Sequence, residues 1–350
     1  MAGESSLRVV HVVCTDQFAG VERSVLLSTR ALHDRGHRVA VIGGEPRAME
    51  EPLSRLGVPW WPAATTLGAA RKLWRQGKVD IVHAHMTAAE SAALPNRLRN
   101  GGRLVVTRHF GQRRGLTALG GLAARVINKM PHTEVAISRY VQSTIGVPSK
   151  VVHHGIDDAP AGEPSRSKVV LVIQRLEVEK RTSIALRAWR LAGLASDGWQ
   201  LIVAGDGTDR AALESLARAE GIASSVRFLG HVWDVDGLRG DAAIQVASPP
   251  SEHFGLSVLE AMARGLPVVA CDGGAHRELV GESYPMLFPL GDVAAAAACL
   301  QSLAVNPSMR SSLGRELRRR QQEHFSLRAH GEALEAVYLD ALGRTSVSAP

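Results

Sequence analysis

The predicted fold depends on the stretch Ser251–Ala270, which reads SEHFGLSVLEAMARGLPVVA. Its middle part, Leu256–Ala263, is rich in helix-forming residues, and Gly255 directly before it marks the start of a helix. Gly265 ends this helix, because glycine readily adopts the left-handed conformation that closes helices. The apolar residues Val268–Ala270 then predict a short buried strand, so the stretch is typical of an α/β domain.

Two carboxylates lie in this stretch, Glu252 before the helix and Glu260 inside it. The peptide N–H groups that begin a helix attract anions, and here they belong to Phe254, Gly255 and Leu256. A carboxylate beside a bound phosphate would repel it, so we expect both carboxylates to accept hydrogen bonds from hydroxyls. This combination suits a sugar nucleotide, which carries a diphosphate between two groups of hydroxyls.

The composition indicates a globular protein of two domains. The chain has 350 residues, of which 45% are hydrophobic and 21% are charged, and this length is enough for two α/β cores. No apolar run approaches the roughly 20 residues that cross a bilayer, and the first residues do not read as a signal peptide. We therefore expect a cytoplasmic protein.

The charge of the chain favours anionic partners. The net charge is +7 and the isoelectric point is about 9.8, which suits nucleotides, phosphorylated acceptors or acidic lipid, although an arginine-rich surface without a partner explains it equally well. Aromatic residues make up only 4%, so we expect no nucleic-acid binding. The cysteines Cys14, Cys271 and Cys299 are far apart, and we expect them to be reduced thiols.

The first half of the chain begins with a strand, a helix and a strand. Apolar runs at residues 7–13 and 36–42 predict buried strands, and a helix is predicted between them from Val21 to His33. Such units form parallel sheets, which bind ligands at the carboxyl ends of their strands. Gly20 lies in the loop after the first strand, so it is either a ligand contact or a simple turn residue.

Histidines lie at the ends of two further predicted strands. Asp80–His85 contains His83 and His85, and residues 104–109 end in His109. A histidine pair suggests a metal site, but no third ligand follows at a fitting spacing, so we expect hydrogen-bonded imidazoles and no metal. His109 can bind a sugar hydroxyl, and a purely structural role is the alternative.

The second half begins with another apolar strand, Val169–Ile173, and two cations follow it, Arg175 and Lys180. A guanidinium can bind two phosphate oxygens at once, and an ammonium acts as a point charge. These cations therefore suit a diphosphate, and solvated surface charges are the alternative. Gly205 ends a later strand in a Gly-x-Gly turn, which on its own is weak evidence for a nucleotide site.

Together these patterns resemble the retaining GT-B glycosyltransferases of family 4. The eight-residue spacing of Glu252 and Glu260 is similar to the Glu-x7-Glu motif of that family. Asp80–His85 resembles its Asp-Val-Val-His-x-His, residues 107–109 resemble its Thr-x-His, and residues 174–180 resemble its Gly-Arg-Leu-x-x-x-Lys. The matches extend over most of the chain.

The resemblance implies an α/β protein with the GT-B fold, in which two Rossmann-like domains with parallel sheets face an interdomain cleft. It implies an acceptor domain over residues 1–160 and a nucleotide-sugar donor domain over residues 161–325. A C-terminal helix at about 326–342 would pack back on the first domain.

The resemblance also implies roles for ten residues. Arg175 and Lys180 would hold the donor diphosphate, Glu252 would bind the transferred sugar, and Glu260 would bind the ribose. The implied catalytic residues are His109, Arg175, Lys180 and Glu252. The implied donor-binding residues are Gly20, Gly205, Phe254, Gly255, Leu256 and Glu260.

The activity implied is transfer of a sugar from a nucleotide-diphosphate sugar to a hydroxyl, with retention of configuration and without a metal or other cofactor. The acceptor would be a small molecule, a glycan or a lipid-linked group. Alternatives are a sugar-nucleotide epimerase or a glycan phosphorylase of the same fold, and a non-catalytic nucleotide-binding module. The last is disfavoured because all four residues Arg175, Lys180, Glu252 and Glu260 are present.

Three positions depart from the family pattern. Ala19 and Gln174 stand where glycine is usual, and His154 stands where asparagine is usual. A side chain at either glycine position restricts how closely the backbone can approach a ligand.

The segment 111–130 alternates basic and apolar residues. It could lie on a membrane surface at the inner face of the membrane or hold an anionic acceptor. The alternative is the core-facing side of an ordinary helix.

Overall fold

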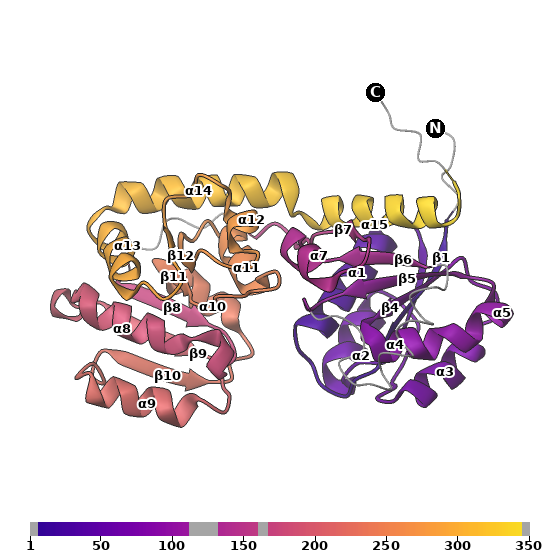
Figure 1. The fold of residues 1–350 in the computed structure, drawn as a ribbon, viewed down its shortest axis with the longest axis horizontal. Helices are drawn as coiled ribbons and strands as arrows, with labels where there is room; N and C mark the ends of the chain where they lie inside the picture. Colours follow the sequence, from indigo (N-terminus) through magenta and orange to yellow (C-terminus); the bar gives the residue numbers. More distant parts are fainter. Residues whose placement is uncertain (1–5, 112–131, 160–166, 345–350) are drawn as a thin grey trace. The chain divides into compact units, whose positions relative to one another are not determined.

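The computed structural model describes residues 6–111, 132–159 and 167–344, and the chain divides into two compact units (Figure 1). The first unit contains Met1–Gly155 together with Leu327–Pro350, and the second contains Ile156–Ser326. Each unit is built around one parallel sheet, which confirms the predicted α/β class with two parallel-sheet units.

Seven described strands form the sheet of the first unit, in the order β3-β2-β1-β4-β5-β6-β7. Every neighbouring pair is parallel. The strands are β1 (Arg8–Val13), β2 (Arg38–Ile42), β3 (Trp60–Trp61), β4 (Ile81–His85), β5 (Arg103–Arg108), β6 (Thr133–Ala136) and β7 (Lys150–Val151).

Helices cover both faces of this sheet, as a buried parallel sheet requires. They are α1 (Gly20–Asp34), α2 (Pro46–Arg55), α3 (Thr66–Trp74), α4 (Met86–Ala93), α5 (Arg97–Asn100), α7 (Arg139–Ile145) and α15 (Leu327–Ala341), with the 3-10 turn η1 (Leu94–Asn96). Helices α3 and α4 pack on one face with Val10, Val82 and Val106. Helices α1 and α15 pack on the other with Val9 and Val105.

Helix α15 comes from the C-terminal end of the chain but belongs to the core of the first unit. Its residues Leu334, Val337 and Tyr338 are buried against Val9 and Ile81. The helix contacts α1 and β5 (Figure 1). Side chains that point from the sheet towards α1 and α15 are therefore closed off from solvent.

Six described strands form the sheet of the second unit, in the order β10-β9-β8-β11-β12-β13. The strands are β8 (Val169–Ile173), β9 (Gln200–Ala204), β10 (Val226–Gly230), β11 (Ile244–Ala247), β12 (Val268–Cys271) and β13 (Leu287–Phe288). The helices are α8 (Thr182–Ala192), α9 (Arg210–Ala219), α10 (Val235–Asp241), α11 (Leu256–Ala263), α12 (His276–Val280), α13 (Val293–Val305) and α14 (Pro307–His324), with 3-10 turns η2 (Val178–Lys180) and η3 (Leu194–Asp197).

The helix and strand predicted from Ser251–Ala270 are present as α11 and β12. Gly255 is the N-cap of α11 with φ +101°, a conformation that favours glycine. Gly265, with φ +67°, follows its last turn. The loop before α11 thus lies at the carboxyl end of β11, next to the loops that follow β8 and β12.

The basic segment 111–130 lies, apart from Gly111, outside the described residues. Among the residues that are described, no helix combines the length and the apolar character needed to cross a bilayer.

Candidate active site

The ten residues predicted to form the site fall in both units. His109 and Gly20 belong to the first unit, and the other eight belong to the second. The eight lie on or beside the loops after β8, β9 and β11. Parallel sheets bind ligands at this edge because their strand ends and helix N-termini meet there.

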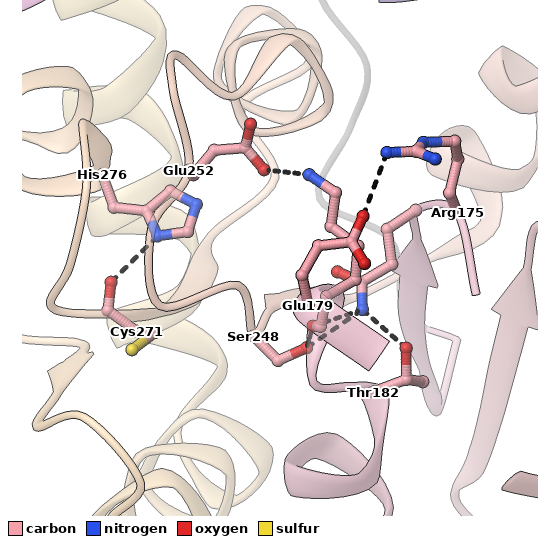
Figure 2. A network of polar contacts seen from close by, with 9 residues as sticks. Arg175, Glu179, Thr182, Ser248, Glu252, Cys271 and His276 are labelled. Carbon is pink, nitrogen blue, oxygen red and sulfur yellow. Dashed lines mark hydrogen bonds and ion pairs between the residues drawn. The ribbon is translucent and has the colours of Figure 1, made fainter. Parts of the chain in front are cut away.

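Lys180 and Glu252 form the central ion pair of the second unit. Nζ of Lys180 lies 2.8 Å from Oε2 of Glu252, and each side chain is 18% exposed. Lys180 ends η2 after β8. Glu252, which is labelled in Figure 2, lies in the loop before α11. Two residues that are 72 positions apart therefore meet because their strands, β8 and β11, are neighbours in the sheet.

The carboxylate of Glu252 is held in its charged form. Burial raises its pKa, but the charge and the hydrogen bond of Lys180 oppose this, and the net pKa lies below the usual value. Among the described residues only Lys180 bonds this carboxylate, through Oε2. Oε1 is therefore available to accept a hydrogen bond from a ligand hydroxyl.

A pair of glycines lets the Glu252 loop pack against the end of β12. The N–H of Ala275 donates to the carbonyl of Glu252 at 2.8 Å. A Cβ atom on Gly274, whose φ is +58°, would lie 2.2 Å from that carbonyl oxygen, and one on Gly273 would lie 2.1 Å from the carbonyl oxygen of Pro250. The position of Glu252 thus depends on both glycines.

His276 lies beside Glu252 and was not among the predicted site residues (Figure 2). It is buried, and burial lowers its pKa although Glu252 opposes the shift. Nδ1 is 2.9 Å from the carbonyl oxygen of Cys271, so the neutral ring donates there and Nε2 is an acceptor. His85 and His109 lie at or just after strand ends, and His276 follows the end of β12 in a similar way, so this pattern could have identified His276.

Arg175 differs from Lys180 in its surroundings. Its side chain is 63% exposed and is paired with Glu179 at 3.2 Å (Figure 2). The neighbouring Leu176 is fully buried and anchors the loop. Arg175 is therefore free to change its conformation, whereas Lys180 is held by Glu252.

Gln174, which replaces the glycine of the family pattern, ties this loop together. Its Nε2 is 2.8 Å from Oγ1 of Thr182, 3.0 Å from Oγ of Ser248 and 3.1 Å from the carbonyl oxygen of Lys180. Thr182 and Ser248, its two side-chain partners, are labelled in Figure 2. Gly205 has φ +140°, and a Cβ atom there would lie 1.9 Å from the carbonyl oxygen of Gln174. Gly205 is thus required for packing of the loops, whatever its role towards a ligand.

Glu260 has a partner that the sequence did not indicate. Its carboxylate Oε2 accepts a hydrogen bond from the guanidinium of Arg239, whose side chain is fully buried in α10. Nε of Arg239 also lies 3.4 Å from Oε1 of Gln245. No spacing rule links these positions, because only the packing of α10 near α11 brings them together.

The start of α11 presents its backbone next to Glu252. Phe254 is buried and its ring meets Phe325 edge-on, with centroids 6.3 Å apart. Leu259 N–H donates to the carbonyl of Gly255, the first bond of the helix. The first N–H groups of a helix have no partner within it, so those of Gly255 and Leu256 can bind an anion.

In the first unit, His109 follows β5 and is buried. Its Nε2 is 3.0 Å from Nδ1 of His85, and its ring stacks on His154 with centroids 5.7 Å apart. Burial lowers its pKa to about 3, so the ring is neutral at physiological pH. His154, at the usual asparagine position, lies 3.1 Å from Oγ of Ser24 through Nδ1.

Gly20 is exposed and is the first residue of α1. Ala19 is the N-cap, and its N–H donates to Oε2 of Glu22 at 2.8 Å. Glu22 thus caps the helix from within its first turn. The departure at Ala19 is compatible with a regular helix start.

His11, His83 and His85 each offer a ring nitrogen within 4.8 Å of the others, so they could hold a metal ion. His11 comes from β1 and is paired in register with His83 of β4. Sequence spacing does not reveal His11 as the third member of this group, because His11 lies 72 residues before His83 and on another strand.

The chain is similar to known proteins in family, sequence and fold. Residues 156–320 match the family described as glycosyl transferases group 1, and residues 18–159 match glycosyltransferase family 4. The chain is 27% identical to phosphatidyl-myo-inositol mannosyltransferase of Mycobacterium leprae, over 86% of this chain and 88% of that protein. It is 33% identical to glycogen synthase of Mycobacterium tuberculosis, over 55% of this chain and 48% of that protein.

Two crystal structures with low sequence identity share the fold. The Anabaena protein HepE in complex with UDP has a TM-score of 0.79 and 18% identity, covering 95% of this chain and 100% of that chain. A glycosyltransferase from Rickettsia africae has a TM-score of 0.79 and 17% identity, covering 97% of this chain and 99% of that chain.

Proposed function

The chain belongs to the glycosyltransferases of family 4 and has their GT-B fold, and from this we propose that it transfers a sugar from a nucleotide-diphosphate sugar to a hydroxyl with retention of configuration. The observation that carries the proposal is the Lys180–Glu252 ion pair beside the start of α11. This arrangement places a cation, an ionised carboxylate and helix N–H groups at one strand edge.

We propose that the second unit binds the donor. Departure of the nucleotide diphosphate leaves negative charge that must be neutralised. Lys180, Arg175 and the N–H groups of Phe254, Gly255 and Leu256 would share this charge without a metal. Glu260 would bind the ribose while it keeps its ion pair with the buried Arg239.

Glu252 is better suited to bind a sugar hydroxyl than to attack the sugar. Its Oε2 is bonded by Lys180, which stabilises the charge that a nucleophile would have to give up. We therefore propose that the acceptor attacks on the face from which the diphosphate departs, and that the departing phosphate takes the proton of the acceptor. Detection by mass spectrometry of a sugar attached to Glu252 would contradict this mechanism.

The acceptor that we propose is a glycan or a lipid-linked group. Relatives of this chain include phosphatidyl-myo-inositol mannosyltransferases and a lipopolysaccharide core mannosyltransferase of Rhizobium leguminosarum, which is 28% identical over 60% of this chain and 64% of that protein. Such acceptors would place the protein in the cytoplasm, with peripheral contact at the inner face of the membrane.

The test begins with a panel of nucleotide sugars in a thermal-shift assay, since a ligand that binds the folded state raises the melting temperature. The donor found in this way is then incubated with lipid and glycan acceptors in EDTA, and NMR of the anomeric proton gives the configuration of the product. Retention without metal supports the proposal.

Other products would contradict the proposed sugar transfer. An epimer formed from the donor alone would indicate an epimerase, and phosphate-dependent release of sugar from a glycan would indicate a phosphorylase. Donor binding with no reaction on any acceptor would indicate a non-catalytic module.

A further inference from the structure

One face of the first sheet carries a group of buried histidines. Residues two apart on a strand point to the same face, and the register pairs His11 with His83 and His85 with Thr107. This face is covered by α1 and α15, as the contact of Tyr338 with His83 shows. His11, His83 and His85 lie on the strands themselves. His109 and His154 follow β5 and β7, and His330 comes from the covering helix α15; all six side chains are buried.

Three of these histidines form a hydrogen-bonded series that we call the imidazole chain: His11, His85 and His109. Nδ1 of His11 is 2.9 Å from Nε2 of His85, and Nδ1 of His85 is 3.0 Å from Nε2 of His109. Burial lowers the pKa of all three rings, so each is neutral and carries one proton.

The proton count leaves only two arrangements of the imidazole chain. Each hydrogen bond needs one proton, and each ring has one to give. If His85 donates from Nε2 to His11, then His109 must donate from Nε2 to His85, and all three rings carry their proton on Nε2. If His85 donates from Nδ1 to His109, then all three carry it on Nδ1.

The His11 end of the imidazole chain decides between these two arrangements of protons. Among the described residues, Nε2 of His11 is buried and has no hydrogen-bond partner. In the first arrangement this atom would be a buried N–H without an acceptor, which folded proteins rarely contain. In the second it is only an unused lone pair, and the N–H without a protein partner is Nδ1–H of His109, which is not among the buried atoms without a partner in the described residues. The second arrangement is therefore favoured, and it gives His109 a proton on Nδ1.

His83 does not interfere with this choice. Its Nδ1 is 2.7 Å from the hydroxyl of Tyr338 and its Nε2 is 2.6 Å from Oγ1 of Thr107. Hydroxyls both donate and accept, so they satisfy either tautomer of the ring. His83 is thus a buried neighbour outside the imidazole chain and serves as a matched control.

We propose that His11 and His85 are positioning residues that hold His109 in the Nδ1–H tautomer, so that His109 donates a hydrogen bond to a substrate oxygen. The role towards substrate rests on the proposed function, whereas the tautomer does not. Nδ1 of His109 has no partner in the described part of the chain and remains available for this contact.

The tautomers can be read directly by long-range proton–nitrogen NMR of protein labelled with nitrogen-15 in histidine. At pH 7.5 we expect His11, His85 and His109 to show protonated Nδ1 and bare Nε2. A protonated Nε2 on any of the three would overturn the proposal. The wild-type spectrum alone gives this answer, so it does not depend on whether a variant folds or whether transfer has been detected.

Variants then test the effect on the reaction. His11→Asn keeps an N–H near the position of Nδ1, so we expect it to retain the His109 tautomer and near wild-type kcat/KM. His11→Asp replaces the donor by a carboxylate acceptor, so His85 must donate from Nε2 and His109 from Nε2; we expect the His109 proton on Nε2 and a loss of kcat/KM of about 5- to 10-fold, the value of one neutral hydrogen bond. The control His83→Asn should change neither the His109 tautomer nor kcat/KM.

Three outcomes would count against the positioning role. Equal kcat/KM in both His11 variants, with folded spectra, would contradict it. So would an effect of His83→Asn as large as that of His11→Asp. Stoichiometric binding of Zn²⁺ alone, with loss of the Nδ1–H signal of His11 or His85, would instead assign a metal site to His11, His83 and His85.

Discussion

The two cations after β8 have the same proposed partner but different structural roles. Arg175 is exposed and its pair with Glu179 lies in solvent, where ion pairs contribute little to stability. Lys180 is mostly enclosed and neutralises Glu252. Their substitution should therefore affect stability differently even if both bind the diphosphate.

We expect Arg175→Ala to lower kcat/KM by about 10- to 100-fold, because it removes charge-assisted hydrogen bonds to the donor. Its free energy of unfolding should stay within about 0.5 kcal/mol of wild type. Lys180→Ala should lose as much activity and also about 1–3 kcal/mol of stability, because Glu252 is left without its partner. Steady-state kinetics and urea unfolding measure both quantities.

The double variant Lys180→Ala, Glu252→Gln is the control. It removes both charges, so it should recover part of the stability that Lys180→Ala loses, without recovering activity. A stability loss in Arg175→Ala that matched its activity loss would show that the arginine has a packing role, contrary to its exposure.

Some residues of the site could be predicted and others could not. Glu252 and Lys180 were predicted from motif spacing, and the structure brings them together because their loops follow the neighbouring strands β8 and β11; their roles towards a ligand stay predictions. Arg239 left no such pattern, since it reaches Glu260 from α10 only after the second unit has folded. His11 was missed for the same reason, because its neighbour His83 lies on another strand.

At the level of elements, the strands and helices with regular apolar patterns agree with the sequence analysis. The predicted helix Leu256–Ala263 has the same limits in the structure, and the strand Val169–Ile173 does as well. Between residues 43 and 79 no element was predicted. Helix α2 contains Pro52 and strand β3 has only two residues, so neither carries a clear periodic signal.

The loop between β12 and α12 supports the loop that carries Glu252. We expect Gly274→Ala to lower the free energy of unfolding by about 1–3 kcal/mol more than Gly291→Ala does. Both glycines have positive φ, +58° and +77°, so both substitutions cost backbone strain. Only at Gly274 would the new Cβ meet backbone, 2.2 Å from the carbonyl oxygen of Glu252, whereas at Gly291 nothing lies within 4 Å.

Urea unfolding compares the two glycine variants, and calorimetric titration with the donor reports the position of Glu252. Gly274→Ala should bind the donor more weakly, and Gly291→Ala should bind it as wild type does. If the two variants were equally stable and bound donor equally, the loop would not depend on the contact between Gly274 and Glu252.

Across the whole molecule, buried neutral histidines are distributed unevenly. In the described part of the first unit, burial lowers the pKa of His11 and His109 to about 3 and of His330 to about 4, and it also lowers the pKa of His83, His85 and His154. In the described part of the second unit, His253 and His276 are lowered. The two units should therefore respond differently to acid.

The direction of this response follows from the proton balance. A histidine that titrates near 6.5 when unfolded and near 3 when folded binds more protons in the unfolded state throughout that interval, so stability is complete above pH 6.5 and falls as the pH falls towards 3. Each such histidine lowers the free energy of unfolding by up to about 1.4 kcal/mol per pH unit. We therefore expect the first unit to lose stability first between pH 6.5 and 5.

Hydrogen exchange, corrected for the intrinsic effect of pH, should show β1, β4 and β5 losing protection at pH 5.5 while β8, β9 and β11 keep it. Simultaneous loss in both sheets, or loss in the second sheet first, would show that these histidines do not control the acid stability of the protein.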